Sequence, residues 1–154
     1  AREKLRKPRT FIHNPEALPV IESEGHRIQV MMGELHGQSS PVETHSPAFY
    51  FHIKLEAGQR LDLPVQDGDN AFVYVVKGEV GLENRTLVSD AQLALYTREG
   101  DLLRYYSKEG CEFLLLGGQP LNEPFYSYGP FVMNTEAQID LCFRNYRSGK
   151  MGEL

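Results

Sequence analysis

The stretch LPVQDGDNAFVYVVKGEVGL, residues 63–82, decides the fold. Its polar run QDGDN at 66–70 is rich in Asp, Gly and Asn, the residue types that tight turns favour. The six residues from Ala71 to Val76 are all apolar or aromatic. We therefore predict strand, turn, strand, with apolar residues on both faces of the second strand. Such a strand is typical of the inside of a sandwich or barrel.

Further strand signals follow one another at short spacing along the chain. Fourteen glycines and nine prolines are spread over its length and favour short strands joined by turns. In the segment 48–58, apolar and polar residues alternate, which indicates a half-buried strand with one apolar face, formed by Phe49, Phe51, Ile53 and Leu55. The other candidate strands lie at 26–35, 91–97, 101–107 and 111–121. The pattern predicts an all-β sandwich or barrel.

The last part of the chain changes to a helical pattern. Thr135 and Gln138 have the spacing of a capping box. The apolar residues that follow fall on one helical stripe, at Ile139, Cys142, Phe143 and Tyr146. Arg144, Arg147 and Gly149 suit the end of a helix. We predict one amphipathic helix that closes the β-domain.

Composition and charge limit the classes of function. A chain of 154 residues suits one domain, and a net charge of −5 argues against a general nucleic-acid binder. The basic start, with Arg2, Lys4, Arg6, Lys7 and Arg9, is interpreted as a solvated tail or linker; binding of nucleic acid or anionic lipid is the alternative. Cys111 and Cys142 make no disulfide framework, and no apolar stretch is long enough for a membrane span. We expect a cytoplasmic protein.

Several strings in this order resemble one family. NAFVYVVKGEV at 70–80 resembles the second half of the first cupin motif. Together with GELHGQSSPV at 33–42, GGQPLNEP at 117–124, YGPFVMNT at 128–135 and the closing helix, it resembles the C-terminal half of the pirin family. The resemblance implies a cupin-type double-stranded β-helix, or jelly-roll barrel, with a C-terminal amphipathic helix. We expect a linker or arm at 1–19 and the C-terminal cupin domain at 20–154.

Pirins are bicupins, and the resemblance implies that their metal, usually iron, lies in the N-terminal barrel on three histidines and a glutamate. No counterpart of that barrel is found in this sequence. Laid on the cupin pattern, the two first histidine positions carry Pro64 and Gln66, and the glutamate position carries Asn70. No histidine follows His52, so the fourth ligand has no candidate either. We therefore expect no metal ligands, no catalytic residues and no cofactor in this chain.

Other residues offer only weak alternatives. A site with two histidines and one carboxylate is conceivable from His36, His45 and His52 with Glu34 and Glu43. The favoured interpretation is ordinary surface histidines, as for His13 and His26. The thiol of Cys142 falls on the apolar helical stripe, where a buried thiol is inert.

Three functions stay open. The first is a cupin module without catalysis of its own that packs on a metal-bearing cupin or on a second copy of itself. The second is a metal-dependent oxygenase similar to quercetin 2,3-dioxygenase, as the resemblance implies for some pirins. The third is a regulatory module that binds a protein or a small aromatic ligand in the barrel, whose interior Phe49, Phe51, Phe72 and Tyr74 would line. We favour the first and expect a homodimer or a pirin N-terminal cupin domain as the partner, with no nucleic acid and no membrane.

Overall fold

The computed structural model describes residues 3, 6 and 9–151. The chain divides into two compact units, one formed by Thr10–Pro120 and the other by Ala1–Arg9 with Leu121–Leu154. Lys4 and Lys7 of the basic start, as well as Arg2, lie outside the described residues. Of that segment, Arg6 forms an ion pair with Glu3.

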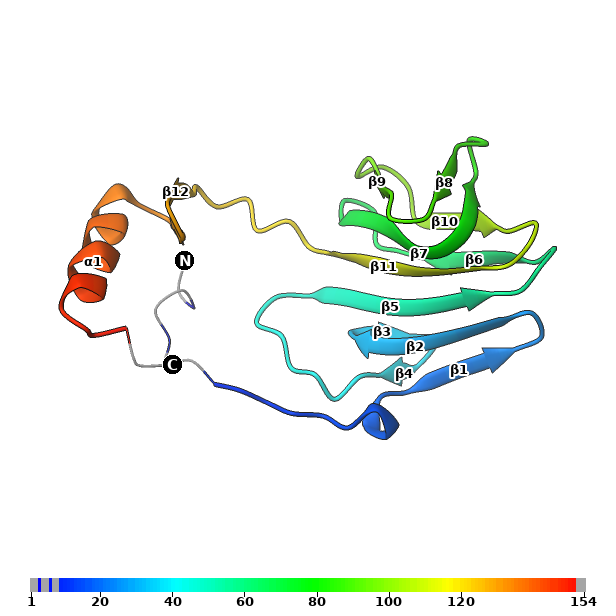
Figure 1. The fold of residues 1–154 in the computed structure, drawn as a ribbon, viewed down its shortest axis with the longest axis horizontal. Helices are drawn as coiled ribbons and strands as arrows, with labels where there is room; N and C mark the ends of the chain where they lie inside the picture. Colours follow the sequence, from blue (N-terminus) through cyan, green and yellow to red (C-terminus); the bar gives the residue numbers. More distant parts are fainter. Residues whose placement is uncertain (1–2, 4–5, 7–8, 152–154) are drawn as a thin grey trace. The chain divides into compact units, whose positions relative to one another are not determined.

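The first unit consists almost wholly of strands (Figure 1). One 3-10 turn, Pro15–Ala17, precedes them. The strands are β1 (Val20–Ser23), β2 (His26–Met32), β3 (Glu34–Leu35), β4 (Gln38–Ser39), β5 (Ala48–Leu55), β6 (Arg60–Pro64), β7 (Asn70–Leu82), β8 (Leu87–Ser89), β9 (Leu93–Leu95), β10 (Leu102–Tyr106) and β11 (Cys111–Gly118). The large sheet has the order β1-β2-β5-β11-β7-β10-β6, with β8 and β9 also paired to β7. Strands β3 and β4 form a small hairpin.

Strand β7 belongs to both layers of this curled sheet. Its first part pairs with β11 and β9, and its last part, from Glu79 onward, pairs with β8 and β10. The bend between them falls at Gly78, whose φ is +83°. A Cβ atom on Gly78 would lie 2.6 Å from the carbonyl oxygen of Gly110. A glycine is therefore required where the strand leaves one layer for the other.

The core lies between the two layers. One face of β5 is buried as predicted, since Phe51, Ile53 and Leu55 are at most 2% exposed and Phe49 packs against the same cluster. The inward residues of β2, β7 and β11 share this face, because strand register places Leu115 opposite both Phe51 and Val73. Tyr105 and Phe113 complete it, with ring centroids 4.8 Å apart.

The prediction that β7 is buried on both faces is wrong. Val73 and Val75 are fully buried, but Val76 is 46% exposed, and Phe72 and Tyr74 are only partly buried. Phe72 and Tyr74 point away from the core and cannot line the barrel interior with Phe49 and Phe51. The alternation of a strand has period two, so an all-apolar run does not tell which face is covered.

The second unit contains β12 (Tyr126–Tyr128), β13 (Phe131–Met133) and α1 (Glu136–Arg147). The capping box is confirmed, because the Gln138 amide N–H bonds the Thr135 hydroxyl while the Gln138 side chain accepts from the Thr135 N–H. Ile139 and Cys142 are buried, and the Phe143 ring lies 5.1 Å from that of Phe131. Tyr146, the last member of the predicted apolar stripe, is 66% exposed.

We predict that Gly78→Ala lowers the free energy of unfolding by about 2–4 kcal/mol, because the new methyl group meets the Gly110 carbonyl in a backbone conformation that L-residues disfavour. Gly58→Ala is the matched control, since Gly58 has φ +77° but no atom within 4 Å of its Cβ position. The control should lose only about 1 kcal/mol. Urea unfolding measures both; equal losses would contradict a steric requirement at Gly78.

Candidate functional site

The open end of the barrel is built by two loops that are bonded to each other. The loop after β6 is joined to the loop before β10 by Val65 N–H to the Asp101 carbonyl, 3.0 Å, and by Gly68 N–H to the Arg98 carbonyl, 2.9 Å. The Gly100 N–H also donates to Asp67 Oδ1 at 2.8 Å. These bonds hold the mouth in one arrangement, which is what a preformed binding site needs.

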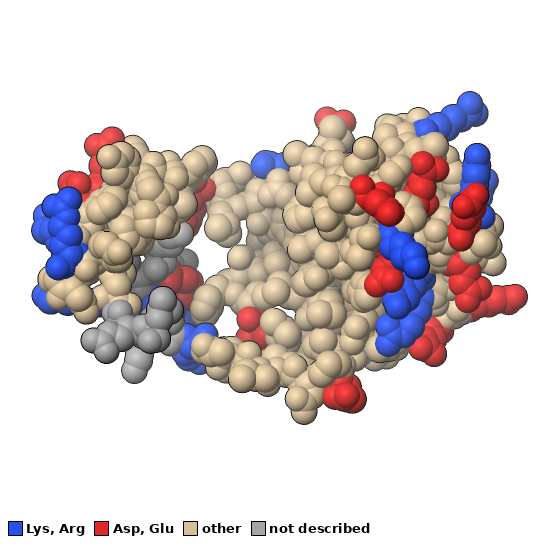
Figure 2. Space-filling model, viewed as in Figure 1, with Lys and Arg blue, Asp and Glu red and all other residues tan. Residues whose placement is uncertain are grey.

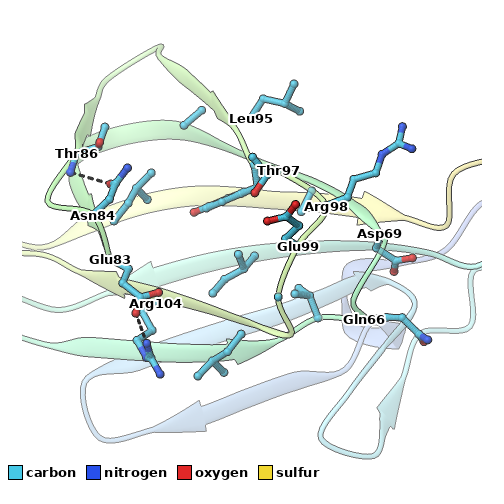
Figure 3. Close-up of a pocket in the computed structure, with 18 residues that line it drawn as sticks. Gln66, Asp69, Glu83, Asn84, Thr86, Leu95, Thr97, Arg98, Glu99 and Arg104 are labelled. Carbon is cyan, nitrogen blue, oxygen red and sulfur yellow. Dashed lines mark hydrogen bonds and ion pairs between the residues drawn. The ribbon is translucent and has the colours of Figure 1, made fainter.

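A cavity of about 650 Å³ opens at this mouth (Figure 3). Its volume lies in the range of small-molecule sites, roughly 300–1,000 Å³. Residues from three loops and from β7, β9 and β10 form its wall. Gln66, from one of the predicted cupin ligand positions, lies on this wall, whereas Pro64 and Asn70 are absent from it.

Asn70, at the cupin glutamate position, already has a partner. Its Oδ1 accepts a hydrogen bond of 2.8 Å from Arg98 Nε. A guanidinium therefore occupies the neighbourhood of the side chain that would bind a metal, and its positive charge repels a cation. Pro64 offers no ligand atom, and Gln66 only an amide.

A partly buried tyrosine, Tyr96, and a buried one, Tyr105, lie close together at the cavity. The Tyr96 ring lines the cavity, while Tyr105 is 1% exposed. Burial raises the pKa of Tyr96 to about 12, although the hydroxyl of Tyr105 near it acts in the opposite direction. Burial, with the charge and hydroxyl of Tyr96, raises the pKa of Tyr105 well above its usual value. Neither hydroxyl has a well-oriented hydrogen-bond partner in the described part of the chain. Both tyrosines therefore stay protonated at neutral pH.

The histidines do not assemble into a site. His36 lies in the turn between β3 and β4 with φ +49°, His45 lies in the loop before β5, and His13 is exposed. His52, on the outer face of β5, is instead paired with Glu112 of β11, with Nε2 and Oε1 2.6 Å apart. Over residues 3, 6 and 9–151, no three His, Cys, Asp or Glu side chains form a group that could hold a metal ion.

The pair of His52 and Glu112 was not foreseen. The two residues are 60 positions apart, and only the register of β5 against β11 brings them together. Burial alone would raise the pKa of Glu112, but the hydrogen bond to His52 and the charge of Lys54 outweigh it and lower this pKa. Lys54 Nζ lies 3.7 Å from the same carboxylate. The three side chains form a polar cluster on an outer face of the sheet.

The surroundings of neither cysteine activate its thiol as a nucleophile. Cys111 and Cys142 are both buried and free. Burial raises the pKa of the Cys111 thiol, with an opposing contribution from Ser107. A thiol is less nucleophilic than a thiolate, so the raised pKa favours a structural role.

Comparison with known proteins agrees with this geometry. A family model described as "Pirin C-terminal cupin domain" matches residues 50–152. The chain belongs to the pirin family. The predicted resemblance and the cupin-type all-β fold are both confirmed.

Relatives in the pirin family are longer than this chain. A pirin-like protein of Solanum lycopersicum is 34% identical over 99% of the chain and 53% of its own length. Human Pirin is 30% identical over 97% of the chain and 53% of its own length. The crystal structure of a quercetin 2,3-dioxygenase from Acinetobacter baumannii has a TM-score of 0.84 at 34% identity, covering 90% of this chain and 49% of that one. The chain thus spans about half the length of these relatives.

The metal of the pirin family does not fit the residues of this barrel. The three cupin ligand positions carry Pro64, Gln66 and Asn70, which provide no imidazole and no carboxylate. The usual ligands of iron in such sites are imidazole and carboxylate groups.

The division into a linker at 1–19 and a cupin domain at 20–154 stays a prediction. No helix among the described residues is long and apolar enough to cross a membrane.

We predict that Glu112→Gln lowers stability at pH 7 by less than about 1 kcal/mol, because the carboxylate is partly exposed. A lowered pKa in the folded state means that the unfolded chain binds the proton more readily. The stabilisation is therefore complete above the usual glutamate pKa of 4.5 and is lost as the pH falls through the lower, folded value. Chemical unfolding at pH 7, 5 and 3 of wild type and variant measures it.

The matched control is Glu24→Gln, an exposed glutamate in the turn between β1 and β2. Its effect should be small at every pH. A difference between wild type and Glu112→Gln that persists undiminished at pH 3 would show that the carboxylate charge is not the cause.

Proposed function

We propose that this chain is a cupin module without catalysis of its own that packs against another cupin barrel. One observation carries the proposal: the position of the cupin glutamate is taken by Asn70, which is bonded to the Arg98 guanidinium. The residues at the barrel mouth suit a structural or binding role better than metal chemistry. The absence of a disulfide between its two buried cysteines agrees with a place in the cytoplasm.

An apolar surface supports the packing part of this proposal. We call it the outer sheet face; it consists of Tyr50, Phe72, Tyr74, Val76, Leu93, Leu95, Leu114 and Leu116. Register places these side chains in one layer, since Leu116 lies opposite Tyr50 and Phe72, and Tyr74 lies opposite Leu93. Leu95 is 74% exposed and Leu93 56%. Clustered apolar side chains of this kind mark interaction sites.

Charged residues border the outer sheet face. His52 and Glu112 lie next along β5 and β11 from Tyr50 and Leu114. Figure 2 shows that the charged side chains of the barrel unit gather towards one end in this view and are sparse over the rest of the visible face. An apolar centre with a polar rim is the usual composition of a protein interface.

The partner that we propose for this face is a cupin barrel. Pirin-family relatives are about twice as long as this chain, so a second domain of similar size accompanies the matched half in them. In that setting the partner is the metal-bearing N-terminal cupin. In the isolated chain, a second copy covers the outer sheet face in two-fold symmetry and gives a homodimer.

Quercetin oxidation is the rival function, because some relatives carry that activity in their names. A putative quercetin 2,3-dioxygenase of Pseudomonas aeruginosa is 32% identical over 80% of this chain and 43% of its own length. For the present residues the ligand set argues against it. Metal-dependent activation of the substrate needs protein ligands that leave open coordination positions.

We predict that the chain forms dimers at tens of micromolar and that Val76→Lys shifts it to monomers, because a charge would enter an apolar contact. Leu87→Lys is the matched control: both side chains are 46% exposed, but Leu87 lies on β8, outside the outer sheet face. Light scattering with size exclusion gives the mass. Monomeric wild type, or equal effects of the two variants, would contradict the proposed face.

We also predict that the purified chain does not consume quercetin, even with added iron. The assay follows the flavonol absorbance together with oxygen uptake, with the Acinetobacter baumannii dioxygenase as the positive control. Elemental analysis of the same sample should find no stoichiometric metal. Sustained turnover that a chelator abolishes and metal restores would overturn the non-catalytic assignment, whatever the state of assembly.

A further inference from the structure

The cavity at the barrel mouth has an apolar interior. The apolar part of its wall is formed by Val65, Ala71, Leu82, Ala94, Leu95, Tyr96, Leu102 and Leu103. Ala94, Tyr96 and Leu103 are partly buried and pack against the hydrophobic core. The cavity therefore offers a firm apolar surface to the body of a ligand, and its loops are held together by the bonds between residues 65–70 and 97–101.

Some charged side chains of the cavity wall are paired with each other and others are not. Three carboxylates, of Asp69, Glu83 and Glu99, line the cavity with two guanidinium groups, of Arg98 and Arg104. Arg104 is neutralised by an ion pair with Glu83 and lies 3.6 Å from Asp62. The wall therefore carries a small excess of negative charge.

Two neighbouring charged residues of the cavity wall, Arg98 and Glu99, point in different directions. In Figure 3 the carboxylate of Glu99 lies among the lining residues, beside Thr97, whereas the Arg98 side chain extends away from them. Arg98 is held there by its bond to Asn70. Glu99 has no hydrogen-bond or ion-pair partner among the described residues, so its carboxylate is available to a ligand.

We propose that this cavity binds a small amphipathic amine, with an apolar body of about one ring against the Tyr96 wall and a protonated amino group at Glu99. An ammonium group donates hydrogen bonds that a carboxylate accepts. Glu99 is exposed, so the pairing adds a modest preference of about 1 kcal/mol to the apolar contact. A carboxylate on the same body is repelled by Glu99. This site needs no metal, and it shares only Leu95 with the outer sheet face.

The test titrates three probes of one skeleton into the full chain labelled with ¹⁵N. The three probes share a 4-hydroxyphenyl ring with a two-carbon chain. The chain ends in an ammonium group in tyramine, in an uncharged methyl group in 4-ethylphenol, and in a carboxylate in 3-(4-hydroxyphenyl)propionate. We expect tyramine to shift the amide signals of residues 65–71 and 94–104 and to bind about fivefold more tightly than 4-ethylphenol. The propionate should bind most weakly.

Two variants locate the interaction. Glu99→Gln should reduce tyramine to the affinity of 4-ethylphenol and leave 4-ethylphenol unchanged, whereas Glu109→Gln, the same charge change outside this cavity, should change neither. Thr97→Trp should block all three probes by filling the cavity. Thr97 and Glu99 are both exposed, so neither substitution changes the packing of the core. Circular dichroism checks that both variants are folded.

Three results would overturn the proposal. The first is that tyramine causes no shifts at these residues up to about 20 mM, an affinity too weak for a specific site. The second is that tyramine and the propionate bind equally well. The third is that Glu99→Gln keeps the preference for tyramine. Each result concerns the cavity alone and leaves the proposed packing on a cupin barrel untouched.

Discussion

The passage of β7 through both layers of the sheet is the constraint on which the barrel depends. Thirteen residues, Asn70–Leu82, pair with β11 and β9 at one end and with β8 and β10 at the other. The change of layer falls at Gly78, where the backbone adopts a positive φ and approaches Gly110 closely. Without this bend the two layers would not enclose Val73, Val75 and Val80 between them.

The same strand also decides the chemistry of the barrel mouth. Its first residue, Asn70, stands at the cupin glutamate position and accepts a bond from Arg98. The loop that carries Arg98 is tied by backbone bonds to the loop after β6, so the guanidinium is part of the mouth's framework. The carboxylates of Asp69 and Glu99 line the cavity beside this bond, and neither has a hydrogen-bond or ion-pair partner among the described residues.

The two faces of the sheet have different roles: the inner face forms the core, and the outer face is proposed to contact a partner. The inner face holds the core, including the buried Tyr105, and Tyr96 from the loop after β9 packs against that core. The outer sheet face is apolar without being covered by the barrel itself, and His52 and Glu112 form its charged border. The exposed apolar side chains of the outer sheet face suit contact with a partner. Membership of a family whose members are twice as long fits this division.

The sequence alone determined the elements that depend on neighbouring residues. The alternation at 48–55, the capping box of Thr135 and Gln138, and the long apolar run at 71–76 each express a local period or a local hydrogen bond. The strings at 70–80, 117–124 and 128–135 likewise indicated the pirin family from the sequence alone. The resemblance to the cupin pattern also assigned Pro64, Gln66 and Asn70 to the ligand positions, and this assignment stays a prediction.

Tertiary structure decided what depends on contacts between distant residues. Which face of β7 is buried follows from the layer that covers it, so the burial of Val73 and the exposure of Val76 could not be told apart by an apolar run. The pair of His52 and Glu112 joins positions 60 apart, and the bond from Arg98 to Asn70 joins positions 28 apart. Both depend on strand register and loop closure, and neither leaves a periodic signal in the sequence. The order of residues along the chain does not show which distant residues come into contact across the sheet.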